Sequence, residues 1–246
     1  MGGTLRVRVA AGTALAVAAA TAAAVAWPLP PVQALPALVR TRLASHGGSY
    51  VPLQRVPWAL RAGVVAVEDD TFYRNPGVDV ASLLRAALAD LRAGRIVQGG
   101  STLTEQLADV VIVHGDRTPL RRLATMLLAL RIARTYPKAT VLELYLNAVY
   151  FGEGAYGIGR AAHVYFHRPV EDLDLAQCAL LAGLPQAPAR YDPAQHPRAA
   201  LRRAREVLAA MVRSHDIGPR AAEAALAELS RWLALPVPGP QRPVRG

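Results

Sequence analysis

Apolar residues recur at helical spacing along most of the chain. In "DVASLLRAALADLRAG" the apolar positions follow an i, i+3, i+4, i+7 order, which predicts one buried helix face. That face comprises Val80, Leu83, Leu84, Ala87, Leu88 and Leu91. Gly94 is expected to end the helix. Because no pattern of strands alternating with helices is visible, we predict one mainly α domain.

The second half of the chain continues this helical pattern. Residues 119–135 are apolar nearly all round, which predicts a central, buried helix. The runs "TVLELYLNAVYFGEG" and "LDLAQCALLAGLP" predict two more helices that end at glycine or proline. Two further helices are predicted near 197–214 and 219–233. We place the domain at residues 49–234 and expect a disordered, low-complexity tail at 235–246.

The N-terminal segment predicts export of this domain. Residues 9–27 carry no charge, and about 20 such residues span a bilayer as a helix. Arg6 and Arg8 precede the span, so residues 1–8 are expected in the cytoplasm and the domain outside. A cleaved signal peptide is the alternative, since "VQALPA" offers small residues to a peptidase. Residues 28–48 are proline-rich and predict an extended linker.

Composition narrows the class of partner. The chain has 246 residues, enough for one or two domains with a sizeable core, and a net charge of +10. Arginine carries nearly all of the positive charge, because Lys138 is the only lysine. A basic protein suits anionic partners such as phospholipid headgroups or a phosphorylated substrate. Nucleic acid is not expected, because basic residues are not interleaved with aromatic residues and the chain is predicted to be exported.

Metal and disulfide chemistry receive no support from the sequence. The single cysteine, Cys178, excludes an internal disulfide and a cysteine zinc cluster. It lies in the apolar run "LAQCALLAGL", which favours a buried hydrophobic residue over a nucleophile. The histidines are scattered without the spacing of metal ligands, so no metal site is predicted.

Three consecutive acids end an apolar run in "GVVAVEDDTFYRNPGVDV". Glu68, Asp69 and Asp70 would cost free energy to desolvate unless they were paired or used. For an isolated acidic triplet, an exposed turn after a helix is the expected interpretation. About thirty residues later, "QGGSTLTEQL" brings two glycines and two hydroxyls to a helix start, which suits a phosphate. Thr102 followed by Glu105 equally fits a capping box, and alone this motif favours capping.

Taken together, the motifs resemble a known family. "EDDTFYRNPGVD", "GGSTLTEQL", "RTPLRR", "VLELYLNAVYFGEGAYGIGRAA" and "VYFHRP" occur in the order and spacing of the peptidoglycan glycosyltransferases, glycosyltransferase family 51. "DLDLAQCALLAGLPQAPARYDP" and "RRAREVL" continue the resemblance. It covers roughly residues 50–211, and five motifs in register make it specific.

The resemblance implies a lysozyme-like helical domain, anchored in the bacterial cytoplasmic membrane by one helix, that polymerises lipid II on the outer side of that membrane. The 4-hydroxyl of an acceptor sugar would attack the anomeric carbon of a chain on undecaprenyl pyrophosphate, with inversion. Glu68 matches the family's general base, at the floor of a cleft where partial desolvation strengthens a base. The resemblance assigns substrate-binding positions to Asp69, Phe72, Arg85, Ser101, Thr102, Gln106, Arg117, Arg121 and Arg122.

The implied partners are lipid II, the nascent glycan strand, membrane lipids and other cell-wall synthesis proteins. Arg8, Arg40, Arg42 and Arg61 are expected to form a basic face against anionic lipid. The transpeptidase module that follows this domain in many relatives needs a Ser-x-x-Lys motif. Thr135 stands three residues before Lys138, the only lysine, so we expect a monofunctional enzyme.

The chain departs from the family in the cleft. Asn75 replaces a histidine and Glu105 a glutamine, and Asp109 and Val110 replace Lys-Asn. Thr125 replaces the second acid, and Arg122 stands for lysine. The change to Asp109 alters the charge by two units near the expected pyrophosphate.

Two hypotheses follow from these departures. In one, the enzyme is active with a rearranged diphosphate site, where Glu105 and Asp109 engage a divalent cation, Mg²⁺ or Mn²⁺, or pair with arginines. In the other, the chain is a degenerate relative that binds lipid II or glycan as a scaffold. Retention of Glu68 favours the first hypothesis, and the loss of the lysine and the second acid favours the second.

Overall fold

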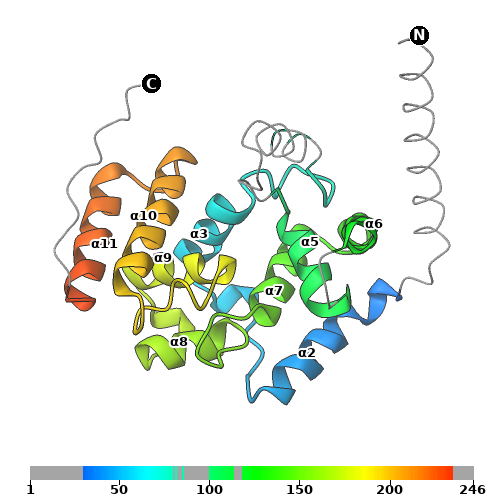
Figure 1. Cartoon of the computed structure of the whole chain (residues 1–246), viewed down its shortest axis with the longest axis horizontal. Coiled ribbons are helices and arrows are strands. Elements are labelled where there is room, and N and C mark those ends of the chain that lie inside the picture. Colours follow the sequence, from blue (N-terminus) through cyan, green and yellow to red (C-terminus); the bar gives the residue numbers. More distant parts are fainter. Residues whose placement is uncertain (1–29, 80, 82–84, 86–99, 114–117, 235–246) are drawn as a thin grey trace, which may run out of the picture.

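The computed structural model describes residues 30–79, 81, 85, 100–113 and 118–234. Over these residues the chain is helical, with one isolated β-bridge between Tyr150 and Tyr156 and no strand (Figure 1). The predicted mainly α fold is therefore confirmed. The predicted span at 9–27, the tail at 235–246 and, apart from residues 81 and 85, the helix predicted at 80–94 lie outside the described residues.

The helices pack in two groups. The first group contains α3 (Trp58–Glu68), α8 (Ile158–Phe166), α9 (Leu175–Gly183), α10 (Pro197–Arg213) and α11 (Pro219–Trp232). The second contains α2 (Leu35–Ser45), α5 (Leu103–Ala108), the π-helix η3 (Asp109–Val113), α6 (Pro119–Thr135) and α7 (Lys138–Ala148). Short 3₁₀ turns lie at Val32–Ala34, Leu53–Arg55, Val170–Asp172 and Leu184–Gln186. Figure 1 shows the first group at the left and the second at the right, with the end of α3 between them.

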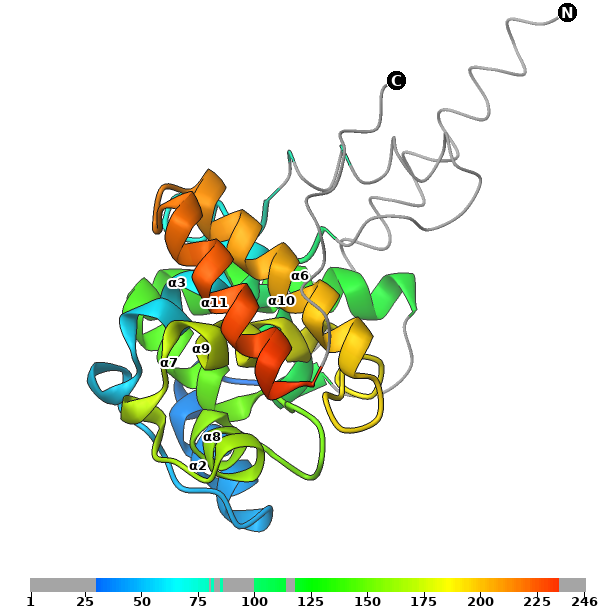
Figure 2. The same cartoon turned by 90° about the vertical axis from the view of Figure 1, so that its left-hand side faces the viewer.

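Helix α9 is the centre of the first group. Seven of its nine residues are buried, because it packs against α3 on one side and α10 on another (Figure 2). Asp174 caps its start in a capping box with Gln177. Cys178 is fully buried, as predicted, and burial raises the pKa of its thiol to about 12. The apolar run around Cys178 is therefore core, and its thiol is protonated at neutral pH.

Residues 30–48 do not form the extended linker that their prolines predicted. They form a 3₁₀ turn and then α2, whose Leu35, Val39 and Leu43 are at most 2% exposed and pack in the core beside α7. Proline at the second position of α2 needs no backbone donor, since the first turn of a helix has unpaired N–H groups anyway. The helical body therefore begins well before residue 49.

Helix α6 also differs from its prediction. Only one face is buried, through Thr125, Leu128, Ala129 and Ile132, and Leu120 is 43% exposed. Its apolar composition suggested a helix surrounded on all sides, but α6 lies at the edge of the second group (Figure 1). The helices predicted near 197–214 and 219–233 are confirmed as α10 and α11. Across the described ranges, no helix is both long enough and apolar enough to cross a bilayer.

Two polar side chains on α7 hold the segment that leads into α3. Glu143 accepts hydrogen bonds from the Tyr50 hydroxyl and the Leu53 amide, both at 2.7 Å. Asn147 accepts from the Val51 amide and donates to the Val51 carbonyl, both at 2.8 Å. Buried backbone groups without such partners would cost free energy, so this pairing fixes where α3 starts and where its far end, Glu68, lies.

Candidate active site

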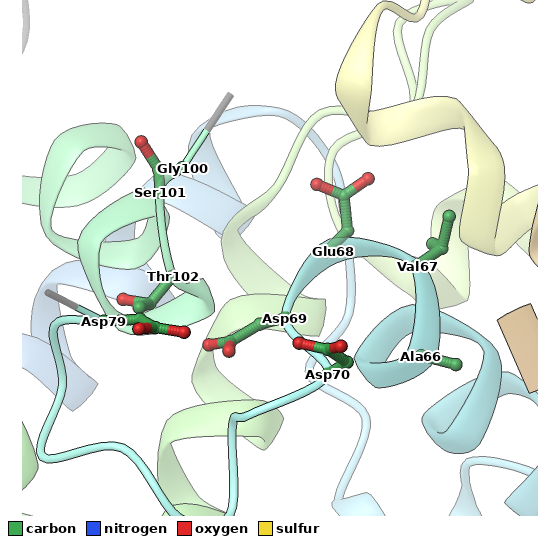
Figure 3. Close-up of a pocket in the computed structure, with 9 residues that line it drawn as sticks. All are labelled: Ala66, Val67, Glu68, Asp69, Asp70, Asp79, Gly100, Ser101 and Thr102. Carbon is green, nitrogen blue, oxygen red and sulfur yellow. The ribbon is translucent and has the colours of Figure 1, made fainter. Parts of the chain in front are cut away.

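A cavity opens where α3 ends. It has a volume of about 210 Å³ and is lined by Ala66, Val67, Glu68, Asp69, Asp70, Asp79, Gly100, Ser101 and Thr102. Figure 3 shows that Glu68 projects away from Asp69 and Asp70, although the three residues are consecutive. The acidic triplet is therefore split: Glu68 faces one set of partners and Asp69 faces another.

Each carboxylate oxygen of Glu68 has a partner from a different helical group. Oε1 accepts from Arg203 of α10 at 2.8 Å, and both side chains are less than 10% exposed (8% and 6%). Oε2 accepts from the side-chain amide of Gln106 of α5 at 3.0 Å. The Tyr145 hydroxyl donates to the Gln106 carbonyl oxygen at 3.1 Å, which fixes the direction of that amide. Burial and the charge of Glu68 raise the pKa of Tyr145 well above its usual value, so its hydroxyl keeps the proton that it donates.

Arg203 is anchored as firmly as Glu68. Its Nε donates to the Gly183 carbonyl at 3.2 Å, and a second guanidinium nitrogen donates to Glu206 at 3.0 Å. Gly183 has no side chain, and a Cβ there would lie 2.8 Å from Cγ of Arg203. The close approach of α9 and α10 at this glycine therefore lets the arginine reach the end of α3.

Asp69 occupies the start of α5. Its carboxylate accepts from the Leu103 amide at 3.0 Å and from the Asn75 side chain at 2.9 and 3.1 Å. Asp69 is 7% exposed, and burial raises the pKa of its carboxyl; the hydrogen bonds and the charge of Lys138 act in the opposite direction. Asp69 thus joins the end of α3 to the start of α5.

Asn75 links Asp69 to the only lysine. Its amide group donates to Asp69, while its carbonyl oxygen accepts from Lys138 Nζ at 3.0 Å and from the Gly77 amide at 2.9 Å. Lys138 also lies 4.6 Å from the centre of the Phe72 ring, a cation–π contact. Burial lowers the pKa of Lys138, and the charge of Asp69 opposes that shift. At the position where the resemblance implied a histidine, this chain has an asparagine, whose side chain donates and accepts without taking up a proton.

The capping box at Thr102 is confirmed. The Glu105 amide donates to the Thr102 hydroxyl at 3.1 Å, and the Thr102 amide donates to the Glu105 carboxylate at 2.8 Å. The Thr102 hydroxyl donates to the Gly77 carbonyl at 2.6 Å. Glu105 is 3% exposed, and burial raises the pKa of its carboxyl. The amides of residues 102, 103 and 105 are thus occupied by the chain's own oxygens, and the phosphate site that the glycine-rich motif suggested stays a prediction.

Asp109, which directly follows α5, pairs with Arg121 of α6. One guanidinium nitrogen donates to Oδ1 of Asp109 at 2.8 Å. Asp109 is also the first residue of the π-helix η3. Arg122 is exposed and acts on Glu105 through its charge alone, while Thr125 is 8% exposed on the buried face of α6. Asp109 and Glu105 are the two acids that depart from the family pattern. Asp109 therefore pairs with an arginine, and Glu105 caps a helix.

Three of the nine predicted binding residues line this cavity, and the others lie in different settings. Ser101 and Thr102 line it with Asp69. Gln106 donates a hydrogen bond to Glu68. Phe72 is fully buried, and its ring contacts Lys138 through the cation–π contact. Arg85 is exposed, and Arg117 lies outside the described residues.

Three residues of the site were not singled out from the sequence. Arg203 and Tyr145 lie within motifs that carried the family resemblance, and Lys138 lies three residues before one, but their contacts join segments far apart in the sequence. Arg203 is 135 positions from Glu68 along the chain. Only the "RRAREVL" motif could have indicated this arginine, and the motif does not show which of its three arginines turns inward.

A metal ion receives no support from the described part of the chain. It contains no group of three histidine, cysteine, aspartate or glutamate side chains placed to hold one. The divalent cation considered from the sequence stays a prediction.

Comparison with known proteins identifies the family. A family model described as Transglycosylase matches residues 37–212. The chain belongs to the transglycosylase family. The matched range covers α2 from residue 37 onward, in agreement with the packing of that helix in the core.

Relatives of this transglycosylase-family chain include much longer proteins. It is 45% identical over 177 residues to penicillin-binding protein 1A of Aquifex aeolicus, covering 72% of this chain and 24% of that protein. A transglycosylase-family protein of Cupriavidus necator is 40% identical over 178 residues, 72% of this chain and 77% of that protein. Penicillin-binding protein 1F of Bacillus subtilis is 40% identical over 187 residues, 76% of this chain and 26% of that protein.

Among solved structures, penicillin-binding protein 1A of Haemophilus influenzae aligns with a TM-score of 0.44 and 23% identity, over 73% of this chain and 17% of that one. This likeness is too weak to carry a conclusion. The chain thus spans about a quarter of the penicillin-binding proteins it matches and most of the length of the Cupriavidus relative.

Proposed function

We propose that the chain is a peptidoglycan glycosyltransferase that polymerises lipid II into glycan strands, with Glu68 as general base. It would act outside the cytoplasmic membrane as a lysozyme-like domain, anchored by residues 9–27. Family membership supports the reaction class. The observation that supports Glu68 most is its position at a cavity with both carboxylate oxygens held from opposite sides.

In this reaction the 4-hydroxyl oxygen of the acceptor sugar attacks the anomeric carbon of the donor. The new C–O bond forms as the bond to the diphosphate oxygen breaks, with inversion, and undecaprenyl diphosphate leaves with the electron pair. Glu68 takes the hydroxyl proton. Its two recorded hydrogen bonds occupy only part of a carboxylate's accepting capacity, so a substrate hydroxyl can still donate to it.

The rival function is binding of lipid II or glycan without polymerisation. It is favoured by Thr125 in place of an acid and by Asp109 beside Arg121. We place it second, because a binding scaffold has no need of a buried, doubly held carboxylate at a cavity.

The test is polymerisation of fluorescent lipid II by the full-length protein in detergent, with and without Mg²⁺ or Mn²⁺, resolved on a gel. We expect polymer from the wild type and at least a hundredfold less, ~10²-fold being usual for a lost general base, from Glu68→Gln. Glu171→Gln is the matched control, because Glu171 forms an exposed pair with Arg55 away from the cavity. Bound lipid II without polymer under every condition would instead favour the scaffold.

A further inference from the structure

Arg121 has hydrogen-bonding capacity that the described protein does not use. Its side chain is 14% exposed, and one guanidinium nitrogen donates to Asp109. Within the described residues, its Nε and its other terminal nitrogen are buried and have no hydrogen-bond partner. Buried guanidinium donors without acceptors cost free energy, so this side chain is set up for a ligand that offers several oxygens. A diphosphate offers them, with charge that matches the guanidinium.

Arg121 lies on the same side of α5 as the catalytic candidate. Gln106, which contacts Glu68, and Asp109, which contacts Arg121, are three residues apart, and side chains at this spacing are neighbours on a helix. A diphosphate at Arg121 would therefore lie near the Glu68 cavity. The other anion site suggested by the sequence, the start of α5, is occupied by Asp69 and Glu105.

Asp109 can leave Arg121 more easily than Arg121 can move. The Asp109 side chain is 45% exposed, and among the described residues its carboxylate has this guanidinium as its one partner. An exposed carboxylate loses little by turning into water, whereas the buried guanidinium keeps its position. The ion pair is thus asymmetric: a fixed cation is covered by a carboxylate that can be displaced.

We propose that Asp109 competes with the diphosphate of the lipid-linked substrate for the guanidinium of Arg121, and so sets the affinity for the diphosphate. The inference rests on the proposed function for the identity of the ligand. In the resting protein Asp109 covers Arg121; the diphosphate displaces it on binding, and Asp109 returns as the lipid diphosphate leaves. Asp109, at the position where the resemblance implied a lysine, is then an affinity-lowering residue that favours product release.

The first test measures inorganic pyrophosphate binding to the full-length protein in detergent by titration calorimetry. Asp109→Asn keeps the size of the side chain but removes its charge, so we expect Kd to fall about three- to tenfold, through loss of the competing pair and of its repulsion. Glu171→Gln, which removes the acid of another arginine pair, should leave Kd unchanged. Arg121→Gln should abolish binding. An unchanged or higher Kd for Asp109→Asn overturns the inference.

A second arm separates the substrate diphosphate from a membrane headgroup. Farnesyl diphosphate and phosphatidylglycerol are compared in the same micelles. Tighter binding of farnesyl diphosphate alone by Asp109→Asn supports the inference, whereas an equal gain for both lipids would indicate a general membrane contact and overturn it.

Failure of the inference and failure of the proposed function are distinguishable. If lipid II is not polymerised but Asp109→Asn still tightens binding of diphosphate, the inference stands and the proposed function fails. If lipid II is polymerised and Asp109→Asn leaves diphosphate binding unchanged, only the inference fails.

Discussion

Glu68 and Arg203 form an ion pair in which both side chains are almost fully buried. Both side chains are less than 10% exposed, and their atoms lie 2.8 Å apart. A buried ion pair adds little net stability, because desolvation opposes the attraction, but an unpaired buried charge is costly. The role of Arg203 is therefore to hold the Glu68 carboxylate in one position, not to add net stability to the fold.

Removing only Arg203 should destabilise the protein strongly. We expect Arg203→Gln to lower the free energy of unfolding by about 3–5 kcal/mol, because Glu68 would stay buried without its cation. The measurement is urea unfolding of the full-length protein in detergent at pH 7. The double variant Glu68→Gln/Arg203→Gln should recover most of the loss, since no buried charge is then left unpaired and Glu206 is exposed. Additive losses in the double variant would contradict this account.

At the residue scale, the sequence predicted the parts of the site that lie within one motif. The box at Thr102 and Glu105 could be predicted because a capping box is local, four residues long, and follows from backbone geometry. The partner of Glu68 on α10 could not, since only the packing of α9 against α10 brings Arg203 to it. The partner of Asp109 could not be predicted for the same reason, because only the packing of α6 brings Arg121 to it.

Helix α5 begins among the chain's own carboxylates. Asp69 and Glu105 accept from its first amides, and the N-terminus of a helix favours negative charge. Burial nevertheless raises the pKa of both carboxyls, and the charge of Asp69 adds to the shift at Glu105. The start of α5 is therefore well hydrogen-bonded but carries an electrostatic cost at neutral pH.

Replacing Glu105 by glutamine should remove that cost. Glutamine keeps the oxygen that accepts from the Thr102 amide, so the capping box persists. Burial raises the folded-state pKa of Glu105 above its ordinary 4.5. The protonated carboxyl therefore contributes its full stabilisation to the folded state below pH 4.5, and this stabilisation is lost as the pH rises through the folded-state pKa. We expect Glu105→Gln to be more stable than the wild type at pH 7, by about 0.5–2 kcal/mol, and equal to it near pH 4. Urea unfolding at both pH values checks this, and a gain that is the same at both would rule out the electrostatic cause.

At the element scale, helical periodicity predicted α10 and α11 almost to their ends, because each has one apolar face against the core. It failed at α2, where prolines before and within the first turn suggested an extended chain. Proline is compatible with that first turn, and the three buried positions of α2 are spaced by four residues each, a signal masked by the proline-rich context.

The whole molecule depends on α2 more than its position in the chain suggests. The two helical groups meet at Glu68, and the geometry there is set partly by α7, which carries Tyr145 and packs against α2. Helix α2 also packs closely against the backbone at Gly157. This glycine adopts a φ of +76°, and a Cβ there would lie 2.7 Å from Cδ1 of Leu43. Helix α2 is thus a packed part of the second group and not a linker.

A shortened chain that begins at residue 49 should consequently lose cooperative folding, whereas one that begins at residue 30 should keep it. The cut at 49 removes Leu35, Val39 and Leu43, and burying each contributes about 1.5–3 kcal/mol. The sum, roughly 4–9 kcal/mol, is comparable with the ~5–15 kcal/mol that stabilises a typical domain. Urea unfolding followed by far-ultraviolet circular dichroism compares the two chains, and Leu35→Ala in the longer chain should give an intermediate midpoint, since a cavity in place of a buried leucine costs about 2–5 kcal/mol. Equal midpoints for the two shortened chains would mean that α2 lies against the domain without stabilising it, and the body would then begin at residue 49 as the proline-rich pattern predicted.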